Sequence, residues 1–315
     1  MEREQRKLDL AARAAWLYYI AGHTQDQIAT SLEVSRPAAQ RLVALAMAER
    51  LIKVRLDHPI AACMDLAATL ADRHGLELVE VVPSDPADPV QHTGLAACAA
   101  ERLERHLAPK APAIVALGTG RAIRAVVDQV SAMERPQHKI VSLVGNMARD
   151  GHASPYEVVM RLADRLGSQR YPTPTPVIAD SVEERELLQA QRAFQTLREL
   201  VAQARITMVG VGVIGWQAPL HKDGFITDAE LAELTERGAV GEIVGWAFDV
   251  EGRLIEGSVN ARVVSMPLEQ PVQRLVIGVA HGPNKVAPIR AALRGRLISG
   301  LITDEATARS ILSDS

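Results

Sequence analysis

A group of polar and basic side chains near the N-terminus has the composition of a DNA-reading surface. Arginine pairs through two hydrogen bonds with guanine and glutamine with adenine, and each good pair discriminates between bases by about 1–3 kcal/mol. Threonine and serine hydroxyls, together with the amides of helix N-termini, hold phosphates and fix the register on the duplex. The spacing therefore predicts DNA contacts from eight residues, namely Thr24, Gln25, Ser35, Arg36, Ala39, Gln40, Arg41 and Lys53.

A second group of candidate residues follows three apolar segments of the strand type. These segments run into Gly118-Thr119-Gly120-Arg121, into the glycine-rich stretch 210–216 and into residues 281–285. Glycines let the backbone approach a ligand closely, and a helix that follows them offers amides to an anion. Together they predict one pocket for an anion or a polyol, whose candidate contacts are Gly118, Thr119, Gly120, Arg121, Gly210, Gly212, Trp216, Asp249 and Lys285.

Three side chains of this second group have expected roles. Lys285 is placed to meet a phosphate or another oxygen-rich ligand, and Asp249 to hold sugar hydroxyls. Trp216 would pack on the apolar face of a sugar ring, with core packing as the alternative for it and for Trp246. Taken singly, each glycine motif also fits a simple turn, and Lys285 fits a solvated lysine. The prediction depends on their combination in one sheet.

Other kinds of site are missing from the sequence. It contains no dinucleotide-binding fingerprint, no Walker loop and no cluster of metal ligands, so no cofactor is expected. Cys63 and Cys98 offer neither a disulfide framework nor metal-ligand spacing. The charged N-terminal segment is unlike a signal peptide, and no apolar run is long enough to cross a membrane. We therefore expect a cytoplasmic protein without a membrane partner.

Three short helices are expected to position the DNA-reading group. The first runs over residues 8–21 and ends at Gly22, since glycine favours the residue after a helix. Thr24 and Gln27 form a capping box at the start of the second helix. Ser35 caps the third, with Pro37 in its first turn. The expected buried faces are Ile28, Ala29 and Leu32 on the second helix and Ala38, Leu42, Leu45 and Ala46 on the third.

Two helices joined by a tight turn, the second opening with arginine and glutamine, make a helix-turn-helix. An ordinary helical hairpin with solvated arginines is the alternative. Residues 52–56 alternate apolar and basic side chains, which fits either a small wing beside the DNA backbone or a plain connecting strand.

The N-terminal segment, residues 1–56, is more basic than the rest of the chain. Residues 1–56 carry nine lysines and arginines against six acids, a net charge of +3 within a chain of net charge −3. This asymmetry suits a DNA-reading module attached to a body that does not touch DNA. We place the boundary between residues 56 and 59, with a helix-turn-helix DNA-binding domain over 1–58 and a sugar- or effector-binding and oligomerisation domain over 59–315.

The rest of the chain alternates apolar strands with helices, the pattern of a parallel sheet covered on both faces. Strands are expected at residues 76–82, 113–117, 139–144, 206–213, 243–248, 275–280 and 297–302. Helices are expected at residues 60–74, 94–107, from 121 onwards, 154–167 with a capping box from Ser154 to Glu157, 181–204 and after 303. The proline-rich segment 171–176 has the composition of a linker. Because the alternation continues on both sides of it, we interpret it as a crossover within one domain.

The whole chain resembles the SorC family of bacterial sugar-responsive transcriptional regulators. The segment from Arg13 to Leu42 is similar to the family's DNA-binding signature, and residues 116–120, 143–146, 241–249 and 301–305 are similar to its effector domain. The resemblance implies an α/β protein with an N-terminal three-helix winged helix-turn-helix domain. A Rossmann-like effector domain similar to sugar-phosphate isomerases and deaminases would follow it. The resemblance also implies a sugar or sugar-phosphate ligand and usually a tetrameric assembly.

The resemblance also implies effector contacts. The loop Gly118–Gly120 would accept the phosphate or terminal hydroxyls of the ligand, with Lys285 beside it and Asp249 as a hydroxyl partner. Two residues depart from the family pattern: Asn146 stands where glycine is expected, and His281 takes part of an expected glycine pair. Both would place polar side chains near the ligand, so a sugar, a sugar alcohol and a sugar phosphate all stay open as the effector.

We therefore predict a transcription factor that binds double-stranded operator DNA and regulates a carbohydrate or polyol catabolic operon. Its subunits are expected to pair through the large domains, as a dimer or a tetramer, and the effector to change the separation of the DNA-binding heads. A sugar-phosphate isomerase- or deaminase-like enzyme is the alternative, with Asp249, Glu242 or His281 as acid or base. We expect no enzyme activity, because no nucleophile is paired locally with a base.

Overall fold

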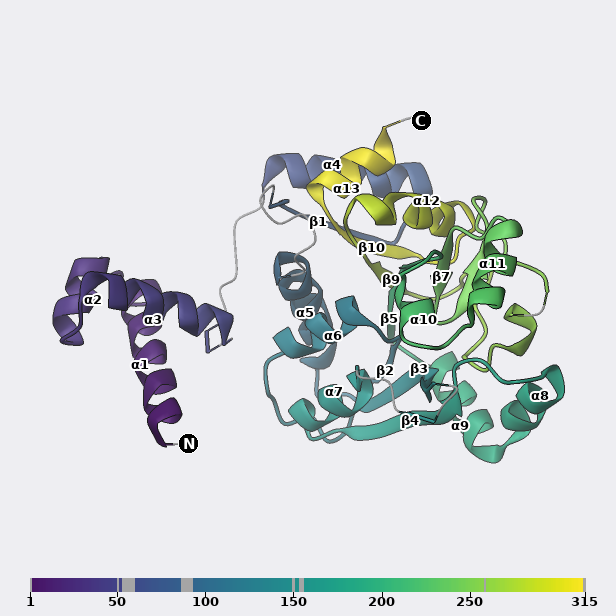
Figure 1. Ribbon diagram of the computed structural model, residues 1–315, viewed down its shortest axis with the longest axis horizontal. Coiled ribbons are helices and arrows are strands. Elements are labelled where there is room, and N and C mark those ends of the chain that lie inside the picture. The colour runs from purple at the N-terminus through teal and green to yellow at the C-terminus, as the bar shows by residue number, and fades with distance from the viewer. Residues whose placement is uncertain are drawn as a thin grey trace. The chain divides into compact units, whose positions relative to one another are not determined.

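The computed structural model of the chain (Figure 1) describes residues 2–49, 51–52, 60–85, 93–148, 151–152, 156–257 and 259–313. The chain divides into two compact units, Met1–His58 and Pro59–Ser315. In the described part of the chain, every helix is too short or too polar to span a bilayer.

The smaller unit consists of three helices, α1 (Glu2–Tyr19), α2 (Gln25–Ser31) and α3 (Arg36–Ala48). Its core is rich in alanine and comprises Ala11, Ala14, Ala15, Ile28, Ala39, Leu42, Val43 and Ala46. The buried face of α3 differs from the prediction, since Ala39 and Val43 are buried whereas Ala38 and Leu45 are only partly so. The predicted wing and Lys53 lie outside the described residues.

The larger unit is built on a seven-stranded sheet. Its strands are β1 (Leu78–Val82), β2 (Ile114–Leu117), β3 (Lys139–Met147), β4 (Gln169–Pro176), β5 (Ile206–Gly210), β9 (Val276–Val279) and β10 (Gly300–Asp304). They lie in the order β1-β10-β9-β5-β2-β3-β4 and every neighbouring pair is parallel. The carboxyl ends of all seven strands therefore share one edge. The chain continues outwards from β2 through β3 and β4 on one side, and from β5 through β9 and β10 on the other. The point between β2 and β5 is therefore the topological switch point, where open α/β sheets bind ligands.

Helices cover both faces of this sheet (Figure 1). One apolar core is shared by α5 (Thr93–Leu107), α6 (Arg121–Gln129) and α7 (Val158–Leu166). The other is shared by α4 (Ala61–His74), α9 (Arg192–Ala202), α12 (Val286–Arg294) and α13 (Glu305–Leu312). On β2, Val115 and Leu117 enter the first core and Ala116 enters the second, because successive strand residues point to opposite faces. The predicted α/β arrangement of the Rossmann type is confirmed.

A small antiparallel sheet accompanies the large one and corrects two predicted strands. It consists of β6 (Gly212–Val213), β7 (Gly241–Ile243) and β8 (Trp246–Phe248). The single strand predicted over 243–248 is wrong, because Val244 and Gly245 have φ values of 47° and 90° and turn the chain into a hairpin. The strand predicted over 206–213 ends at Gly210, and β6 pairs with β7 instead.

Two predicted helices also need correction. The helix expected over 181–204 is interrupted at Gln191, whose extended backbone (ψ 139°) separates α8 (Val182–Ala190) from α9. The capping box expected from Ser154 to Glu157 is wrong, because Glu157 itself is the N-cap of α7, at φ 44°, and makes no side-chain cap. Ser154 lies outside the described residues. The remaining elements of the larger unit are α10 (Pro219–Lys222), α11 (Asp228–Glu236) and the 3₁₀ turns Asn260–Arg262 and Pro283–Lys285.

The proline-rich segment forms β4 at one edge of the large sheet. At one end of β4, Gln169 N donates to His138 O (3.2 Å). At the other end, Val177 N donates to Met147 O (3.4 Å). The three prolines, at 172, 174 and 176, have no amide donor, which an edge strand tolerates, and the β3–β4 register shifts twice along this stretch. The segment is therefore part of the domain, as predicted, but as a strand.

Candidate functional site

Two capped helices hold the candidate DNA-contacting residues. Thr24 Oγ1 accepts a hydrogen bond from Gln27 N (3.4 Å), and Thr24 N donates to Gln27 Oε1 (2.8 Å). Ser35 Oγ accepts from Ala38 N (3.3 Å), and Pro37 lies in the first turn of α3. Both predicted N-caps and the capping box are confirmed. Glu33, at φ 53°, turns the chain between the two helices.

The outer face of α3 carries the predicted base-reading side chains. Arg36, Gln40 and Arg41 are exposed, as are the capping residues Thr24 and Ser35, and Gln25 is half-buried at the first position of α2. Ala39 is completely buried. Its prediction as a DNA contact is wrong, because it packs in the alanine-rich core on the opposite face of the helix.

Arg36 is held by a neighbouring carboxylate. Its Nε lies 3.4 Å from Asp26 Oδ1, and the two side chains are 68% and 70% exposed. Asp26 is in the first turn of α2, where the helix dipole stabilises a negative charge. An ion pair this exposed contributes only about 0–1 kcal/mol, so a DNA group can replace the carboxylate at little cost.

In the larger unit, the loop after β2 lies at the switch point of the sheet. Gly118 packs so tightly that an added Cβ would lie 3.2 Å from Val244 Cγ1. Gly120 is the N-cap of α6 at φ 106°, a backbone conformation that favours glycine, and provides no side-chain cap. The first amides of α6 are therefore available to an anion. A Cβ on Gly210, at the end of β5, would lie 3.7 Å from Thr119 O, so the ends of β2 and β5 adjoin.

A cation and a carboxylate lie on the β5 side of this loop. Lys285 Nζ donates to Val211 O (2.8 Å). The Glu242 carboxylate lies directly over Gly212, where any Cβ would collide with it, and accepts from Gly245 N (2.9 Å). Burial raises the pKa of Glu242, although the Gly245 amide and Lys285 favour its ionised form. Burial also lowers the pKa of Lys285, against the attraction of Glu242.

Arg121 connects the start of α6 to the segment before α7. It is exposed and hydrogen-bonds with Tyr156. The Tyr156 hydroxyl donates to Asp223 Oδ2 (2.7 Å), at the end of α10, and Arg124 Nη1 donates to Tyr156 O (3.0 Å). Burial, together with Asp223, raises the pKa of Tyr156. These contacts hold Tyr156 just before α7.

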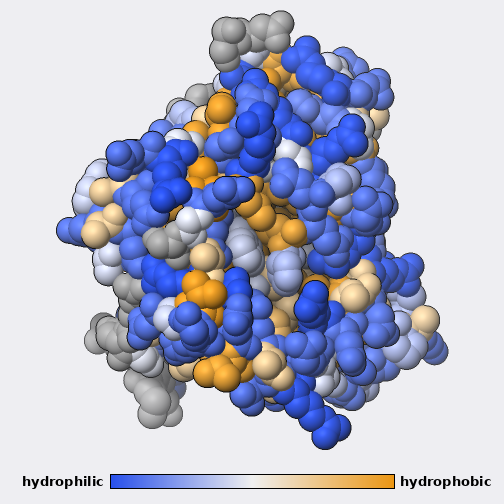
Figure 2. All heavy atoms as spheres, turned by 90° about the vertical axis from the view of Figure 1, so that its right-hand side faces the viewer, coloured by the Kyte–Doolittle hydropathy of each residue, from blue (hydrophilic) through white to orange (hydrophobic). Residues whose placement is uncertain are grey.

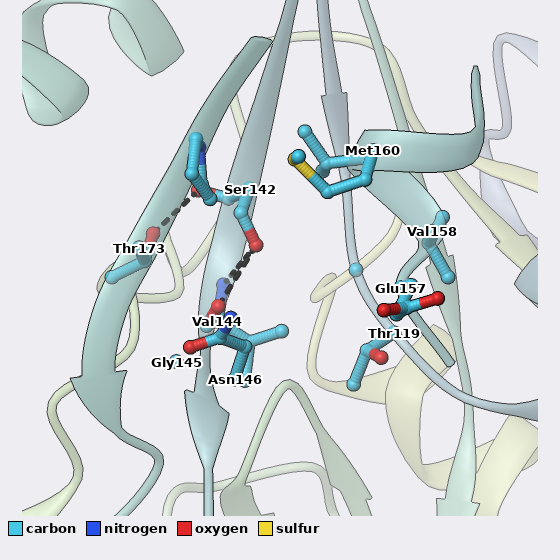
Figure 3. Close-up of a pocket in the computed structure, with 12 residues that line it drawn as sticks. Thr119, Ser142, Val144, Gly145, Asn146, Glu157, Val158, Met160 and Thr173 are labelled. Atoms are coloured by element: carbon cyan, nitrogen blue, oxygen red, sulfur yellow. Dashed lines mark hydrogen bonds between the residues drawn. The ribbon is translucent and has the colours of Figure 1, made fainter. Parts of the chain in front are cut away.

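On the β3 side of the same loop, a pocket opens at the start of α7 (Figure 3). Its volume is about 390 Å³, including open space at its mouth. It is lined by Gly118, Thr119, Ser142, Val144, Gly145, Asn146, Glu157, Val158, Val159, Met160, Pro172 and Thr173. Asn146 projects from β3 on one side, and Thr119 and Glu157 lie on the other (Figure 3). Ser142 Oγ donates to Val144 O (2.8 Å), and Thr173 Oγ1 donates to Ser142 O (3.3 Å).

The structure thus brings most of the predicted effector residues together. Three of them, Gly118, Thr119 and Asn146, line the pocket. The others near the same loop are Gly120, Arg121, Gly210, Gly212 and Lys285. In the described residues, no group of three or more histidine, cysteine or acidic side chains is arranged to hold a metal ion.

Asp249 directly follows the hairpin that carries Glu242. Its Oδ1 accepts from Glu251 N and Arg253 N (2.9 Å each) and holds the turn after β8. In that turn Gly252 packs against Gly295, beyond the C-terminal end of α12. α12 starts at the ligand edge and runs away from it for about 13 Å. Backbone amides thus engage one carboxylate oxygen of Asp249, and its effector contact stays a prediction.

His281 faces away from the glycine loop. It is buried, and its Nδ1 lies 3.8 Å from Asp304 Oδ2, on the β10 side of β9. Asp304 also accepts from Ser84 Oγ (2.8 Å) and Thr307 N (3.0 Å). Burial acts to raise the pKa of Asp304, but hydrogen bonds from His281, Thr307 and Ser84 outweigh it and hold that pKa well below its usual range. The predicted effector contact of His281 is therefore wrong, and its role is structural.

Trp216 is neither in the core nor in the lining of the pocket. It is 62% exposed and contacts the His221 ring edge-on, with the ring centres 5.1 Å apart. The core-packing alternative is therefore wrong for Trp216, whereas Trp246 is half-buried and donates to Met266 O (3.0 Å).

Several residues of the site are absent from the sequence prediction. Glu242 entered it only as an acid or base of the enzyme alternative. Glu157 was assigned to a capping box, and Thr173 belonged to a proline-rich stretch that was interpreted as a crossover. The usable signal for Glu157 was its place shortly after a strand that ends at the ligand edge.

Comparison with known proteins assigns the chain to a family. The family model of a sugar-binding domain (Sugar-bind) matches residues 58–313. The erythritol catabolism regulatory protein EryD of Brucella abortus is 34% identical over 96% of this chain and 96% of its own. The transcriptional regulator LsrR of Klebsiella pneumoniae is 30% identical over 97% of this chain and 93% of its own. These relatives support a sugar-responsive regulator rather than the enzyme alternative.

The fold agrees with this assignment. The crystal structure of the full-length sorbitol operon regulator SorC of Klebsiella pneumoniae superposes with a TM-score of 0.72, at 24% identity, over 97% of this chain and 98% of that chain. The resemblance predicted from the sequence is therefore confirmed. The chain belongs to the SorC family of sugar-binding transcriptional regulators.

Proposed function

We propose that the chain is a cytoplasmic transcription factor for a carbohydrate or polyol catabolic operon. Its α2–α3 pair binds operator DNA, and a sugar, sugar alcohol or sugar phosphate binds at the carboxyl edge of the large sheet without being converted. The observation that carries this proposal is the pairing of a capped helix-turn-helix with a glycine loop at the switch point of the sheet. The names of EryD and SorC, which refer to erythritol and sorbitol, support a polyol-related operon.

In the smaller unit, the exposed face of α3 enters the major groove. Arg36, Gln40 and Arg41 reach base edges from its first two turns. Thr24, Gln25 and Ser35 contact phosphates through side chains and helix N-terminal amides, and Lys53 adds a backbone contact. Ala39 contributes to the core instead.

In the larger unit, the loop Gly118–Gly120 and the first amides of α6 hold a phosphate or the terminal hydroxyls of the ligand. Lys285 and Arg121 supply positive charge beside it, and Glu242 accepts hydroxyl groups. Asn146 contacts the ligand from β3. Trp216 extends the rim, since its segment leads into α10, which is joined to the site through Asp223 and Tyr156.

Two copies of the chain bind together through the larger unit, so that two recognition helices meet half-sites one helical turn, about 34–36 Å, or its multiples apart. On the face shown in Figure 2, hydrophilic residues dominate and hydrophobic residues show mainly towards the centre. α8 packs on the core through Leu188 but exposes Val182 and Leu187, which a second copy would cover. The effector shifts the assembly only through its different affinity for two arrangements.

The direct test measures DNA binding by fluorescence anisotropy, using duplexes from the region upstream of the chain's own gene. Wild type should bind them with sequence preference, and Arg36→Ala and Arg41→Ala should each lose about 5- to 150-fold in affinity, because a bidentate base contact is worth about 1–3 kcal/mol. Both variants should keep effector binding, and Arg198→Ala, an exposed residue of α9, should bind DNA normally. Wild-type affinity and preference in both variants would overturn the assignment of α3.

The effector arm uses erythritol, sorbitol and their terminal monophosphates. At least one should change the anisotropy titration and raise the melting temperature. Prolonged incubation with each compound, followed by mass spectrometry, should return it unchanged. Catalytic turnover would overturn the proposal of binding without conversion.

A further inference from the structure

The loop after β2 divides the effector site into two parts of different charge. β2 has β5 on one side and β3 on the other. Lys285 and Glu242 lie on the β5 side, whereas the pocket at the start of α7 lies on the β3 side. Thr119 belongs to both parts, since its carbonyl lies beside Gly210 and the residue also lines the pocket. A ligand that spans the loop therefore has two distinct ends.

The pocket on the β3 side offers hydroxyl-binding groups and a negative charge. Of the described residues that line it, none is a lysine, an arginine or a histidine. Ser142 and Thr173 are engaged with backbone carbonyls. The polar side chains that remain are a hydroxyl, an amide and a carboxylate, those of Thr119, Asn146 and Glu157 (Figure 3).

Glu157 has an unusual backbone for its type. Its φ and ψ of 44° and 34° are left-handed, a conformation that favours glycine and asparagine. It is the N-cap of α7, yet its side chain makes no cap for the helix. The carboxylate instead lies at the pocket beside Thr119 (Figure 3). Strained residues of this kind gather at ligand sites.

We propose that this pocket receives the uncharged, hydroxyl-bearing end of the effector, and that Glu157 accepts hydrogen bonds from its hydroxyl groups. The inference rests on the proposed function of the larger unit as an effector domain. A carboxylate accepts hydroxyl donors well and repels a phosphate at the same distance. Any phosphate of the ligand therefore binds at α6 and Lys285, and a sugar bisphosphate with a phosphate at each end is excluded.

The test measures the affinity of full-length protein by calorimetry for four- and six-carbon sugar alcohols and for their terminal monophosphates. Glu157→Gln should weaken every ligand that binds wild type by about tenfold, which is the loss of one charge-assisted hydrogen bond. If the pocket held the phosphate instead, removing the negative charge would tighten the monophosphates. Tighter binding or unchanged binding would each overturn the inference.

A second variant also tests which end of the effector lies in the pocket, by adding a negative charge there instead of removing one. Asn146→Asp adds a carboxylate to the pocket, so it should leave affinity within about threefold if hydroxyls bind there. A loss of more than tenfold that is confined to monophosphates would place the phosphate in the pocket and overturn the inference. Glu199→Gln, an exposed residue of α9, serves as the matched control and should change nothing.

The outcomes distinguish a failure of the proposed effector function from a failure of the proposed ligand orientation. If no sugar alcohol or monophosphate binds wild type, the proposed effector function fails. If ligands bind and lose affinity in Lys285→Met but not in Glu157→Gln, the effector function stands and only the orientation of the ligand is overturned.

Discussion

At the residue scale, the Asp26–Arg36 ion pair places a carboxylate beside an arginine that is proposed to read DNA. The two groups are 3.4 Å apart on the exposed face of the smaller unit. A phosphate backbone repels Asp26 and competes for Arg36, so the pair must open when the duplex binds. Asp26 thus weakens DNA binding slightly, and only a good contact between Arg36 and a base compensates for this loss.

This arrangement predicts that Asp26→Asn binds DNA more tightly but less selectively. Affinity for an unrelated duplex should rise about two- to fivefold, because an exposed ion pair is worth up to about 1 kcal/mol. Anisotropy titrations with upstream and unrelated duplexes at two salt concentrations would measure it. Asp9→Asn, an exposed acid on α1, is the control. The same gain in both variants would attribute the effect to net charge alone.

Asp304 gives a second prediction, in which stability depends on pH. Its folded pKa lies below the ordinary value of 3.8, so its stabilisation is present above that pH and is lost as the pH falls towards the folded pKa. Asp304→Asn should cost about 1–3 kcal/mol at pH 7, since hydrogen bonds to an ionised acceptor are lost. The melting temperature should fall by about 2–4 °C per kcal/mol.

The measurement compares thermal unfolding of Asp304→Asn and wild type at pH 7 and at pH 3.5. The difference should shrink at the lower pH, because residue 304 of the unfolded wild-type chain binds a proton there while the folded carboxylate stays charged. Asp164→Asn, whose carboxylate is 62% exposed beside Arg170, should show a small difference at both. A deficit of equal size at both pH values would show that amide geometry, and not charge, causes the loss.

At the scale of elements, apolar composition predicted the helices and strands well where burial is complete. β2 and β9 are almost entirely apolar and β10 begins so, and the positions of all three agree with the prediction to within three residues. The alanine-rich α3 was harder, because alanine differs little between its two faces, and Ala39 was misplaced.

Local backbone geometry explains the other errors. The 241–248 hairpin depends on a positive φ at Val244, a β-branched residue that rarely adopts one, so only Gly245 signals the turn in the sequence. The same holds for Glu157, whose left-handed backbone brings a carboxylate to the pocket. The glycine loop at 118–120 was predictable because its glycines meet real steric demands. The position of Asp249 was not, since it depends on the hairpin.

The contact between β6 and β7 yields a prediction about Gly212. A Cβ there collides with the Glu242 carboxylate. Gly212→Ala should therefore destabilise the larger unit by about 1–3 kcal/mol through overpacking and weaken effector binding by displacing Glu242.

Thermal unfolding and calorimetry would measure both effects. Gly215→Ala, three residues further on, has open space around its added Cβ and is the matched control. If Gly212→Ala binds the effector with wild-type affinity, Glu242 does not contact the ligand.

At the scale of the whole molecule, each of the two units has an apolar core of its own among the described residues. The core of α1–α3 contains residues 10–52 only, and the two cores of the larger unit contain only residues after 60. Each unit therefore has its own source of hydrophobic stabilisation.

A fragment of residues 60–315 should accordingly fold by itself. We expect it to melt within a few degrees of the corresponding transition of the full chain, to keep its effector affinity and to lose DNA binding. Circular dichroism, calorimetry and anisotropy would check these properties. A fragment that fails to unfold cooperatively would show that α1–α3 contribute to the stability of the effector unit.

The prolines of β4 constrain how copies of the chain can assemble. An ordinary edge strand presents a row of donors to which a strand of another molecule can add. Residues 172, 174 and 176 of β4 are prolines and supply no donor to such a row. The prolines of β4 therefore disfavour a sheet that continues from one subunit into the next at this edge.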